Sequence, residues 1–187
     1  MSTSWIFRRS NHQIPLSRLL LALSVVVLIF AGCSGGGWRV VEGDEFTIEF
    51  PGIPVDTATS VGETSGARLY FIPVEESIDS NAYYSVSVYA LPDSASILGD
   101  QLDDMFLKDA EIYAWSMGAI VVDSGNVVQS GAYEGREYTI FMARNAGVIK
   151  MRKFAKGKNL YTLIVITQNG YMDNDDVFRF MNSFKLK

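Results

Sequence analysis

Strict alternation of apolar and polar residues is the dominant pattern of this chain. Residues 46–50 and 82–91 show this period of two, which is typical of β-strands with one buried face, and the apolar run at 68–74 is expected to form a further strand. Between residues 96 and 115 the apolar side chains recur instead at helical spacing, and the alternation returns afterwards. Strands on both sides of one amphipathic helix can form an antiparallel sheet that the helix covers. We therefore expect an α+β fold.

The second half of the chain contains three further predicted strands joined by short loops. The strands are residues 135–143, 148–154 and 160–167. Turn-forming residues occupy the loops at 145–147 and 156–159, so the three strands should form an antiparallel meander. Residues 55–66, in the first half, are rich in Thr, Ser and Gly. We expect them to form a loop.

An apolar segment lies near the N-terminus, from residue 19 to residue 31. Its length of about 13 residues falls short of the roughly 20 that a helix needs to cross a bilayer. Arg8, Arg9 and Arg18 precede the segment, and no acidic residue occurs before Glu42. A basic start, a short apolar stretch and small residues at its end are the features of a secretion signal. We therefore expect the chain to be exported.

The end of this segment, Phe30-Ala31-Gly32-Cys33, resembles the lipobox of bacterial lipoproteins, although the pattern prefers Leu, Val or Ile where Phe30 stands. The resemblance implies cleavage before Cys33 and attachment of lipid to its sulfur, and two or three acyl chains anchor a protein stably. We expect a helical signal peptide at residues 1–32, a flexible tether at 33–43 and a domain at 44–187. The domain would lie in the cell envelope, on the extracytoplasmic side of a membrane, which in a Gram-negative cell is the outer membrane or the periplasmic face.

Cysteine and histidine each occur once, as Cys33 and His12. Cleavage before Cys33 would remove the histidine, and lipid would occupy the cysteine. A domain without free thiols or imidazoles cannot hold a Cys- or His-based catalytic triad, a thiolate–imidazole zinc site or an internal disulfide. We therefore predict no catalytic residue, no cofactor and no metal ion, and we do not expect an enzyme.

The exported part of the chain is acidic. Three of the 16 basic residues lie in the predicted signal peptide, whereas all 21 acidic residues follow Cys33. Proteins that bind nucleic acid present basic surfaces to the phosphate backbone. We therefore exclude nucleic acid as a partner.

Five short motifs lie at core and turn positions of the predicted domain. They are Phe46-x-Ile48-x-Phe50-Pro51-Gly52, Gly131-x-x-x-Gly135-x-Glu137-Tyr138, Arg152-x-Phe154, Leu160-Tyr161-x-Leu163 and Phe180-x-x-Ser183-Phe184. Together they resemble the Mog1/PsbP-like superfamily, which includes a photosystem II extrinsic subunit and bacterial envelope lipoproteins. The resemblance implies an α/β/α sandwich, in which helices flank an antiparallel sheet, and a role in binding or assembly.

Basic residues gather on the hairpin formed by the predicted strands at 148–154 and 160–167. They are Lys150, Arg152, Lys153, Lys156 and Lys158. Such a cluster could bind an anionic lipid surface, a wall polymer or an acidic partner protein. The same spacing is typical of a solvated strand face and its turn. The sequence leaves both interpretations open.

Two further patterns allow a structural and a functional interpretation. The acidic run at 173–176 precedes an apolar helical stretch, which favours a helix N-terminus over a calcium site. Tyr83, Ser85, Ser87 and Tyr89 share one face of a predicted strand. That face could bind a sugar or a peptide, but such residues more often form cross-strand pairs or pack against a helix.

These observations lead to one expected function and two alternatives. We expect a lipid-anchored envelope protein whose domain binds another envelope component as an accessory or assembly factor. The first alternative is a carrier that holds a small apolar or lipid ligand between the sheet and a helix, in a pocket with apolar walls. A carboxylate-based hydrolase is third, because no pair of facing acids stands out. The partner and the oligomeric state stay open.

Overall fold

The computed structural model describes residues 37–61, 64–72, 81–91, 99–143, 147–167 and 174–187. Residues Gly37–Lys187 form a compact unit of their own. The predicted signal peptide and Cys33 lie outside the described residues. Within the described part of the chain, no helix is both long enough and apolar enough to span a membrane.

An eight-stranded antiparallel sheet forms the centre of the domain. Its strands follow the order β3-β4-β5-β10-β9-β8-β6, and β7 pairs with β8 beside this path. The predicted meander is confirmed, since β8, β9 and β10 are neighbours. The strands are β3 Val55–Val61, β4 Thr64–Ile72, β5 Asn81–Ala90, β6 Ala119–Val121, β7 Asn126–Ser130, β8 Tyr133–Met142, β9 Val148–Lys156 and β10 Asn159–Thr167.

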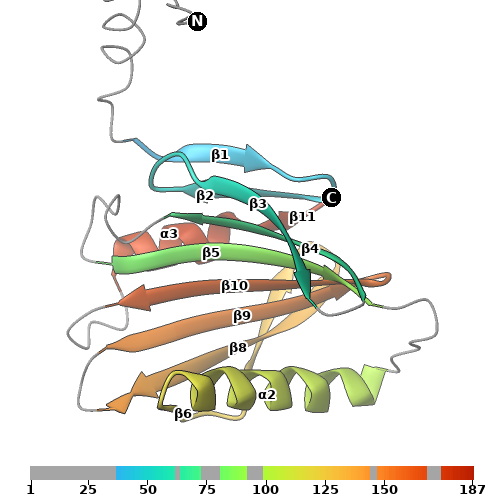
Figure 1. Ribbon diagram of the computed structural model, residues 1–187, viewed down its shortest axis with the longest axis vertical. Helices are drawn as coiled ribbons and strands as arrows, with labels where there is room; N and C mark the ends of the chain where they lie inside the picture. Colours follow the sequence, from blue (N-terminus) through green and yellow to red (C-terminus); the bar gives the residue numbers. More distant parts are fainter. Residues whose placement is uncertain (1–36, 62–63, 73–80, 92–98, 144–146, 168–173) are drawn as a thin grey trace, which may run out of the picture. The chain divides into compact units, whose positions relative to one another are not determined.

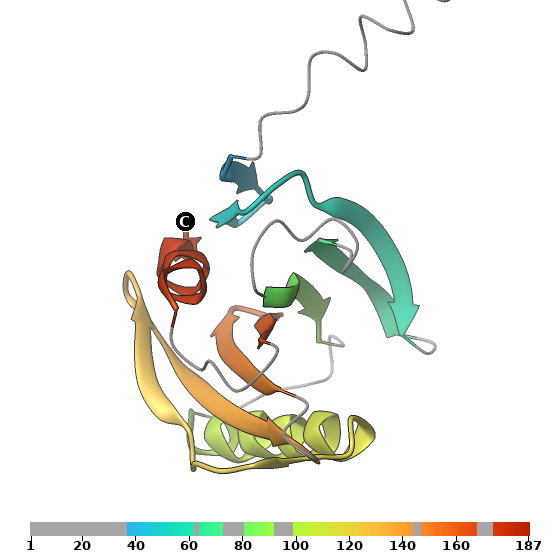
Figure 2. The same cartoon turned by 90° about the vertical axis from the view of Figure 1, so that its left-hand side faces the viewer.

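Helices and a small second sheet cover the two faces of the large sheet (Figures 1 and 2). Helix α2, Gly99–Ser116, lies on one face. Helix α3, Asp175–Ser183, lies on the other face together with a three-stranded sheet in the order β1-β2-β11. The small sheet consists of β1 Arg39–Glu42, β2 Phe46–Phe50 and β11 Lys185–Leu186. The expectation of an antiparallel sheet flanked by helices is therefore confirmed.

The first hydrophobic core lies between the large sheet and the layer of α3 and the small sheet. The alternation in β2 buries Phe46, Ile48 and Phe50 on the side that faces this core. The ring of Phe180, from α3, packs edge-on against Phe50 at 5.1 Å and Tyr84 at 5.2 Å between ring centroids. Aromatic residues from the beginning, middle and end of the domain therefore share one core.

The second core lies between α2 and the opposite face of the large sheet. Ala110 and Ala114 are buried at the contact, and their small side chains allow the helix to lie close to the strands. Phe106 of α2 is buried in the same cluster as Tyr138 and Met151 of the sheet. Burial raises the pKa of the Tyr138 hydroxyl to about 12, so this side chain stays protonated.

Gly135, in β8, lies where the backbone of β9 passes unusually close. A Cβ atom at this position would lie 2.3 Å from the Lys153 carbonyl oxygen and 2.5 Å from the Phe154 ring. Any side chain would force the two strands apart. The close packing of β8 against β9 therefore explains why glycine occupies position 135 of the motif that ends in Glu137-Tyr138.

The structure corrects two sequence expectations near the start of the domain. Residues 55–61 and 64–66 do not form a loop, because β3 and the beginning of β4 pair there at the edge of the large sheet. An edge strand buries few side chains, so its sequence does not need an apolar alternation. In addition, β1 pairs with β2 along its whole length although it lies within residues 33–43, which the sequence assigned to the tether. The folded domain therefore begins before residue 44.

Candidate functional site

The structure divides the five basic residues of the β9–β10 hairpin between the two faces of the sheet. Lys150, Arg152 and Lys156 lie on the face of α3 and the small sheet, whereas Lys153 points towards α2. Lys158 lies in the turn, where its carbonyl oxygen accepts a hydrogen bond from the Leu91 amide. The five side chains therefore do not share one surface.

Acidic partners hold the basic residues on the α3 face. Arg152 donates to Glu137, and Lys150 Nζ lies 3.7 Å from the same carboxylate. Arg152 also donates to the carbonyl oxygen of Met181 at 2.8 Å and to Asn182 Oδ1 at 2.9 Å. These contacts tie the sheet to the end of α3. They give Arg152 a structural role.

A pocket of about 370 Å³ lies between α2 and the large sheet, and we call it the α2 pocket. Its walls are mainly apolar, and they combine residues from the helix and from three strands. The lining residues are Ser87, Tyr89, Leu91, Met105, Phe106, Asp109, Lys153, Leu160 and Thr162. Pockets of this size and character commonly bind small molecules.

Lys153 is the buried polar group of the α2 pocket. Lys153 is only 3% exposed. Its ammonium group donates hydrogen bonds to the Asp109 carboxylate and, at 3.2 Å, to the Thr162 hydroxyl. Asp109 is 63% exposed, at the solvent side of this pair. A buried ammonium is tolerated only when it is paired in this way. Among the described lining residues, the pair therefore leaves no net charge.

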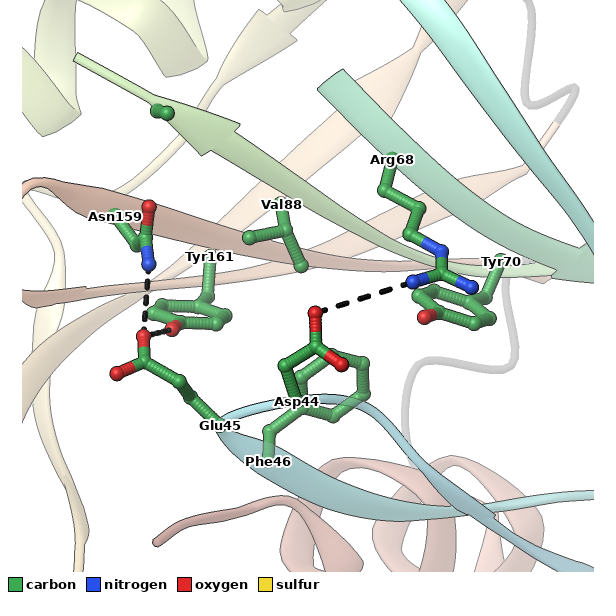
Figure 3. Close-up of a pocket in the computed structure, with 9 residues that line it drawn as sticks. Asp44, Glu45, Phe46, Arg68, Tyr70, Val88, Asn159 and Tyr161 are labelled. Atoms are coloured by element: carbon green, nitrogen blue, oxygen red, sulfur yellow. Dashed lines mark hydrogen bonds and ion pairs between the residues drawn. The ribbon is translucent and has the colours of Figure 1, made fainter. Parts of the chain in front are cut away.

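A second pocket, of about 250 Å³, opens on the opposite face of the large sheet, and we call it the β2 pocket. Residues at the start of β2 form one side, and strands β4, β5 and β10 form the other (Figure 3). Aromatic rings and acidic groups predominate. The lining residues are Asp44, Glu45, Phe46, Arg68, Tyr70, Val88, Ala90, Asn159 and Tyr161.

Glu45 is fixed in an ionised state at the edge of the β2 pocket. Its Oε2 accepts hydrogen bonds of 2.7 Å from the Tyr161 hydroxyl and from Asn159 Nδ2, and Lys156 Nζ lies 3.3 Å from Oε1. The hydrogen bond from Tyr161, followed by that from Asn159, holds the pKa of the Glu45 carboxyl below its usual value. Burial, together with the bond to Glu45, raises the pKa of Tyr161.

Arg68 forms the other side of the β2 pocket. It donates to both oxygens of Asp56, at 3.0 and 2.7 Å, in the two-pronged geometry that suits a carboxylate. Its guanidinium carbon also lies 5.3 Å from the centre of the Tyr70 ring. The hydrogen bonds to Asp56 raise the pKa of Arg68, so the group is always charged.

Comparisons with known proteins identify a fold. No protein-family model matches the chain, and no curated protein matches it. The solution structure of cyanobacterial PsbP (CyanoP) from Synechocystis sp. PCC 6803 matches with a TM-score of 0.55. The match covers 83% of this chain and 96% of CyanoP. The domain has a PsbP-like fold. At 12% sequence identity the likeness extends to the fold alone.

The tyrosine- and serine-rich face of β5 turns towards α2 in this PsbP-like fold. Ser85 is buried, and Tyr83 stacks with Phe71 at 6.3 Å between ring centroids. Ser87 and Tyr89 line the α2 pocket. The interpretation as packing beneath a helix therefore fits Tyr83 and Ser85, while the other two residues border a cavity.

The acidic run at 173–176 begins α3 of the PsbP-like domain. Asn174 is the N-cap, and its Oδ1 accepts a 2.9 Å hydrogen bond from the Val177 amide. Asp175 and Asp176 occupy the first turn, where negative charge stabilises a helix. Residue 173 lies outside the described residues. Among those that are described, no group of three metal-ligating side chains comes together.

Removal of the α3 cap should have a measurable effect on stability. We expect Asn174→Ala to lower the free energy of unfolding by about 1 kcal/mol, because the Val177 amide loses its acceptor. Asn174→Asp retains a side-chain oxygen and should stay close to the unmutated chain. Urea denaturation measures both variants. Equal stability of the alanine and aspartate variants would contradict the capping role.

Sequence reasoning missed the acidic and arginine residues of the two pockets. Asp109 lies on α2, far along the chain from Lys153, and no short motif links the two. Asp44, Glu45 and Arg68 meet only because the small sheet packs over the large one in the PsbP-like fold. The one available signal was the tyrosine- and serine-rich face of β5, because two of its residues, Ser87 and Tyr89, line the α2 pocket.

Proposed function

We propose that this protein is a non-catalytic binding protein of the cell envelope that holds a small, uncharged and mainly apolar ligand in the α2 pocket. Lipid on Cys33 would anchor it to the extracytoplasmic face of a membrane. The observation that supports the ligand is the α2 pocket itself, a cavity of about 370 Å³ with mainly apolar walls between a helix and a sheet. This is the feature that a carrier needs.

The size of the α2 pocket limits the ligand. Since each water molecule occupies about 30 Å³ in the liquid, the cavity has room for about a dozen non-hydrogen atoms. Met105, Phe106 and Leu160 provide apolar contact. A short alkyl chain or a single ring system with one polar group would fit these dimensions and walls.

The charges of the α2 pocket favour an uncharged ligand. Lys153 and Asp109 already neutralise each other, so a charged headgroup would lose its hydration without gaining an unpaired counterion. Ser87 Oγ, which donates to the Thr162 carbonyl oxygen, can accept a hydrogen bond from a neutral polar group, and Thr162 Oγ1, which accepts from Lys153, can donate one. An alcohol, an amide or an ester is therefore preferred to a carboxylate or an amine.

A titration with matched eight-carbon probes tests the ligand proposal. In two-dimensional NMR spectra of residues 34–187, octan-1-ol should shift the amide signals of Phe106 and Leu160. It should bind about tenfold more tightly than octanoate or octylammonium, because the charged analogues pay for desolvation. Met105→Trp, which fills the pocket, should abolish binding.

The control for this titration is Ile112→Trp, on the same helix. Ile112 is 57% exposed, so its replacement leaves the pocket open and octan-1-ol should bind as before. Binding that survives Met105→Trp, or signal shifts confined to other regions, would contradict the proposal. Mass spectrometry of the native protein would separately test lipid on Cys33, since a free thiol on an uncleaved chain would disprove the anchor.

A further inference from the structure

We propose that the β2 pocket is a second binding site, which takes a small organic cation with an ammonium or guanidinium group. The site lies on the face of the large sheet opposite the α2 pocket, so the two sites use different residues. The proposal rests on the charge balance of the pocket, on its aromatic rings and on the way it already holds the guanidinium group of Arg68.

The β2 pocket has an excess of negative charge. Among the described residues at this pocket and in direct contact with its charged groups, there are three carboxylates and two basic side chains. Arg68 is paired with Asp56, and Lys156 is paired with Glu45. The remaining carboxylate is that of Asp44, which is 94% exposed at the mouth of the pocket.

Asp44 is placed to bind an incoming cation. Its carboxylate lies 4.0 Å from Arg68 Nη1, which is beyond hydrogen-bond distance, so the contact is a weak one. Figure 3 joins the two side chains by the dashed line of this long ion pair, with Asp44 on the β2 side and Arg68 on β4. A cation that enters from solvent can therefore pair with Asp44 without breaking a strong internal bond.

Aromatic rings lie behind the acidic groups. The rings of Phe46 and Tyr70 meet edge-to-face at 5.6 Å between centroids, and those of Phe46 and Tyr161 at 6.1 Å. The negative face of an aromatic ring attracts cations, and sites for quaternary ammonium groups combine such rings with carboxylates. Arg68, held over Tyr70 and between acidic neighbours, is an example of the same chemistry within the chain.

The size of the pocket sets the scale of the ligand. A volume of 250 Å³ corresponds to about eight water molecules. That is enough for a trimethylammonium group, or for a guanidinium group with its neighbouring methylene groups. The cation could therefore be a free quaternary ammonium compound or the side chain of an arginine or lysine on a partner, and these sources share one recognition chemistry.

Calorimetric titration of the whole protein in dodecyl maltoside micelles tests this site. The probes are choline, its uncharged isostere 3,3-dimethylbutan-1-ol, and N-acetyl-arginine amide, all at low salt. At least one of the two cations should bind about tenfold more tightly than the isostere, and this preference should weaken at high salt. Tighter binding of choline would identify the ligand as a free quaternary ammonium compound. Tighter binding of the arginine derivative would identify it as a basic side chain of a partner.

Two variants assign the binding to this pocket. Asp44→Asn removes a weakly paired charge from an exposed position and should reduce the affinity for the cation about tenfold without affecting folding. Asp104→Asn, an identical change on the exposed side of α2, should leave the affinity unchanged. Equal binding of choline and its isostere, an unaffected Asp44→Asn variant, or no heat with either cation would overturn the proposal. None of these results bears on the α2 pocket.

Discussion

Replacement of Phe180 by alanine is expected to lower the free energy of unfolding by about 3–5 kcal/mol. The side chain is completely buried, and its ring joins α3 to Phe50 of the small sheet and to Tyr84 of the large sheet. Truncation would remove these contacts and leave a cavity where three elements meet. Few single substitutions in this domain should have a larger effect.

The matched control for this prediction lies two residues away on the same helix. Phe178 is 50% exposed, so Phe178→Ala removes the same atoms but leaves no enclosed cavity, and it should change stability by less than about 1 kcal/mol. Urea denaturation followed by circular dichroism measures both variants. Similar losses for the two variants would show that the aromatic core at Phe180 does not hold α3 in place.

Replacement of Glu137 by alanine should have the second largest effect, a loss of about 2 kcal/mol. The carboxylate is largely buried and accepts from Arg152 while pairing with Lys150, both of which are also largely buried. Without it, two cations remain next to each other with little access to water. Arg152 would also lose the partner that aims it at the end of α3.

A nearby glutamate provides the comparison. Glu134, in the same strand, also accepts a hydrogen bond from an arginine, but its side chain is exposed, and Asp103 can still pair with Arg136. Glu134→Ala should therefore reduce stability by only about 0.5 kcal/mol. A second check is Glu137→Ala combined with Arg152→Met, which should regain part of the loss. If Glu137→Ala alone were as stable as Glu134→Ala, the buried ion pairs would not contribute to the fold.

Periodicity was sufficient to predict the elements that have one buried face. β2, β5, α2 and the β8–β9–β10 meander each show a clear pattern, because each places alternate or helically spaced residues in one of the two cores. β1 and β3 show no such pattern. They lie at the edges of their sheets, where a side chain can face solvent on either side of the strand.

Local sequence was not sufficient to predict the two pockets. Each pocket combines side chains from three or more elements, and the residues that decide its charge come from segments that no motif connects. The basic hairpin illustrates the same limit. Its composition suggested a charged surface, but the alternation within β9 sends Lys153 and Arg152 to opposite faces, and acidic residues elsewhere in the chain meet both.

The pairing of β2 with β11 has a consequence for the order of events during synthesis. Residues Phe46 and Thr47 hydrogen-bond with Leu186 and Lys185, and the Lys187 amide donates to the Glu45 carbonyl oxygen. The third strand of the small sheet therefore becomes available only after residues 185–186 have left the ribosome, long after β2 has been synthesised. Pairing between segments so far apart in the sequence slows folding, so the small sheet should close late, after the large sheet has formed around β8, β9 and β10.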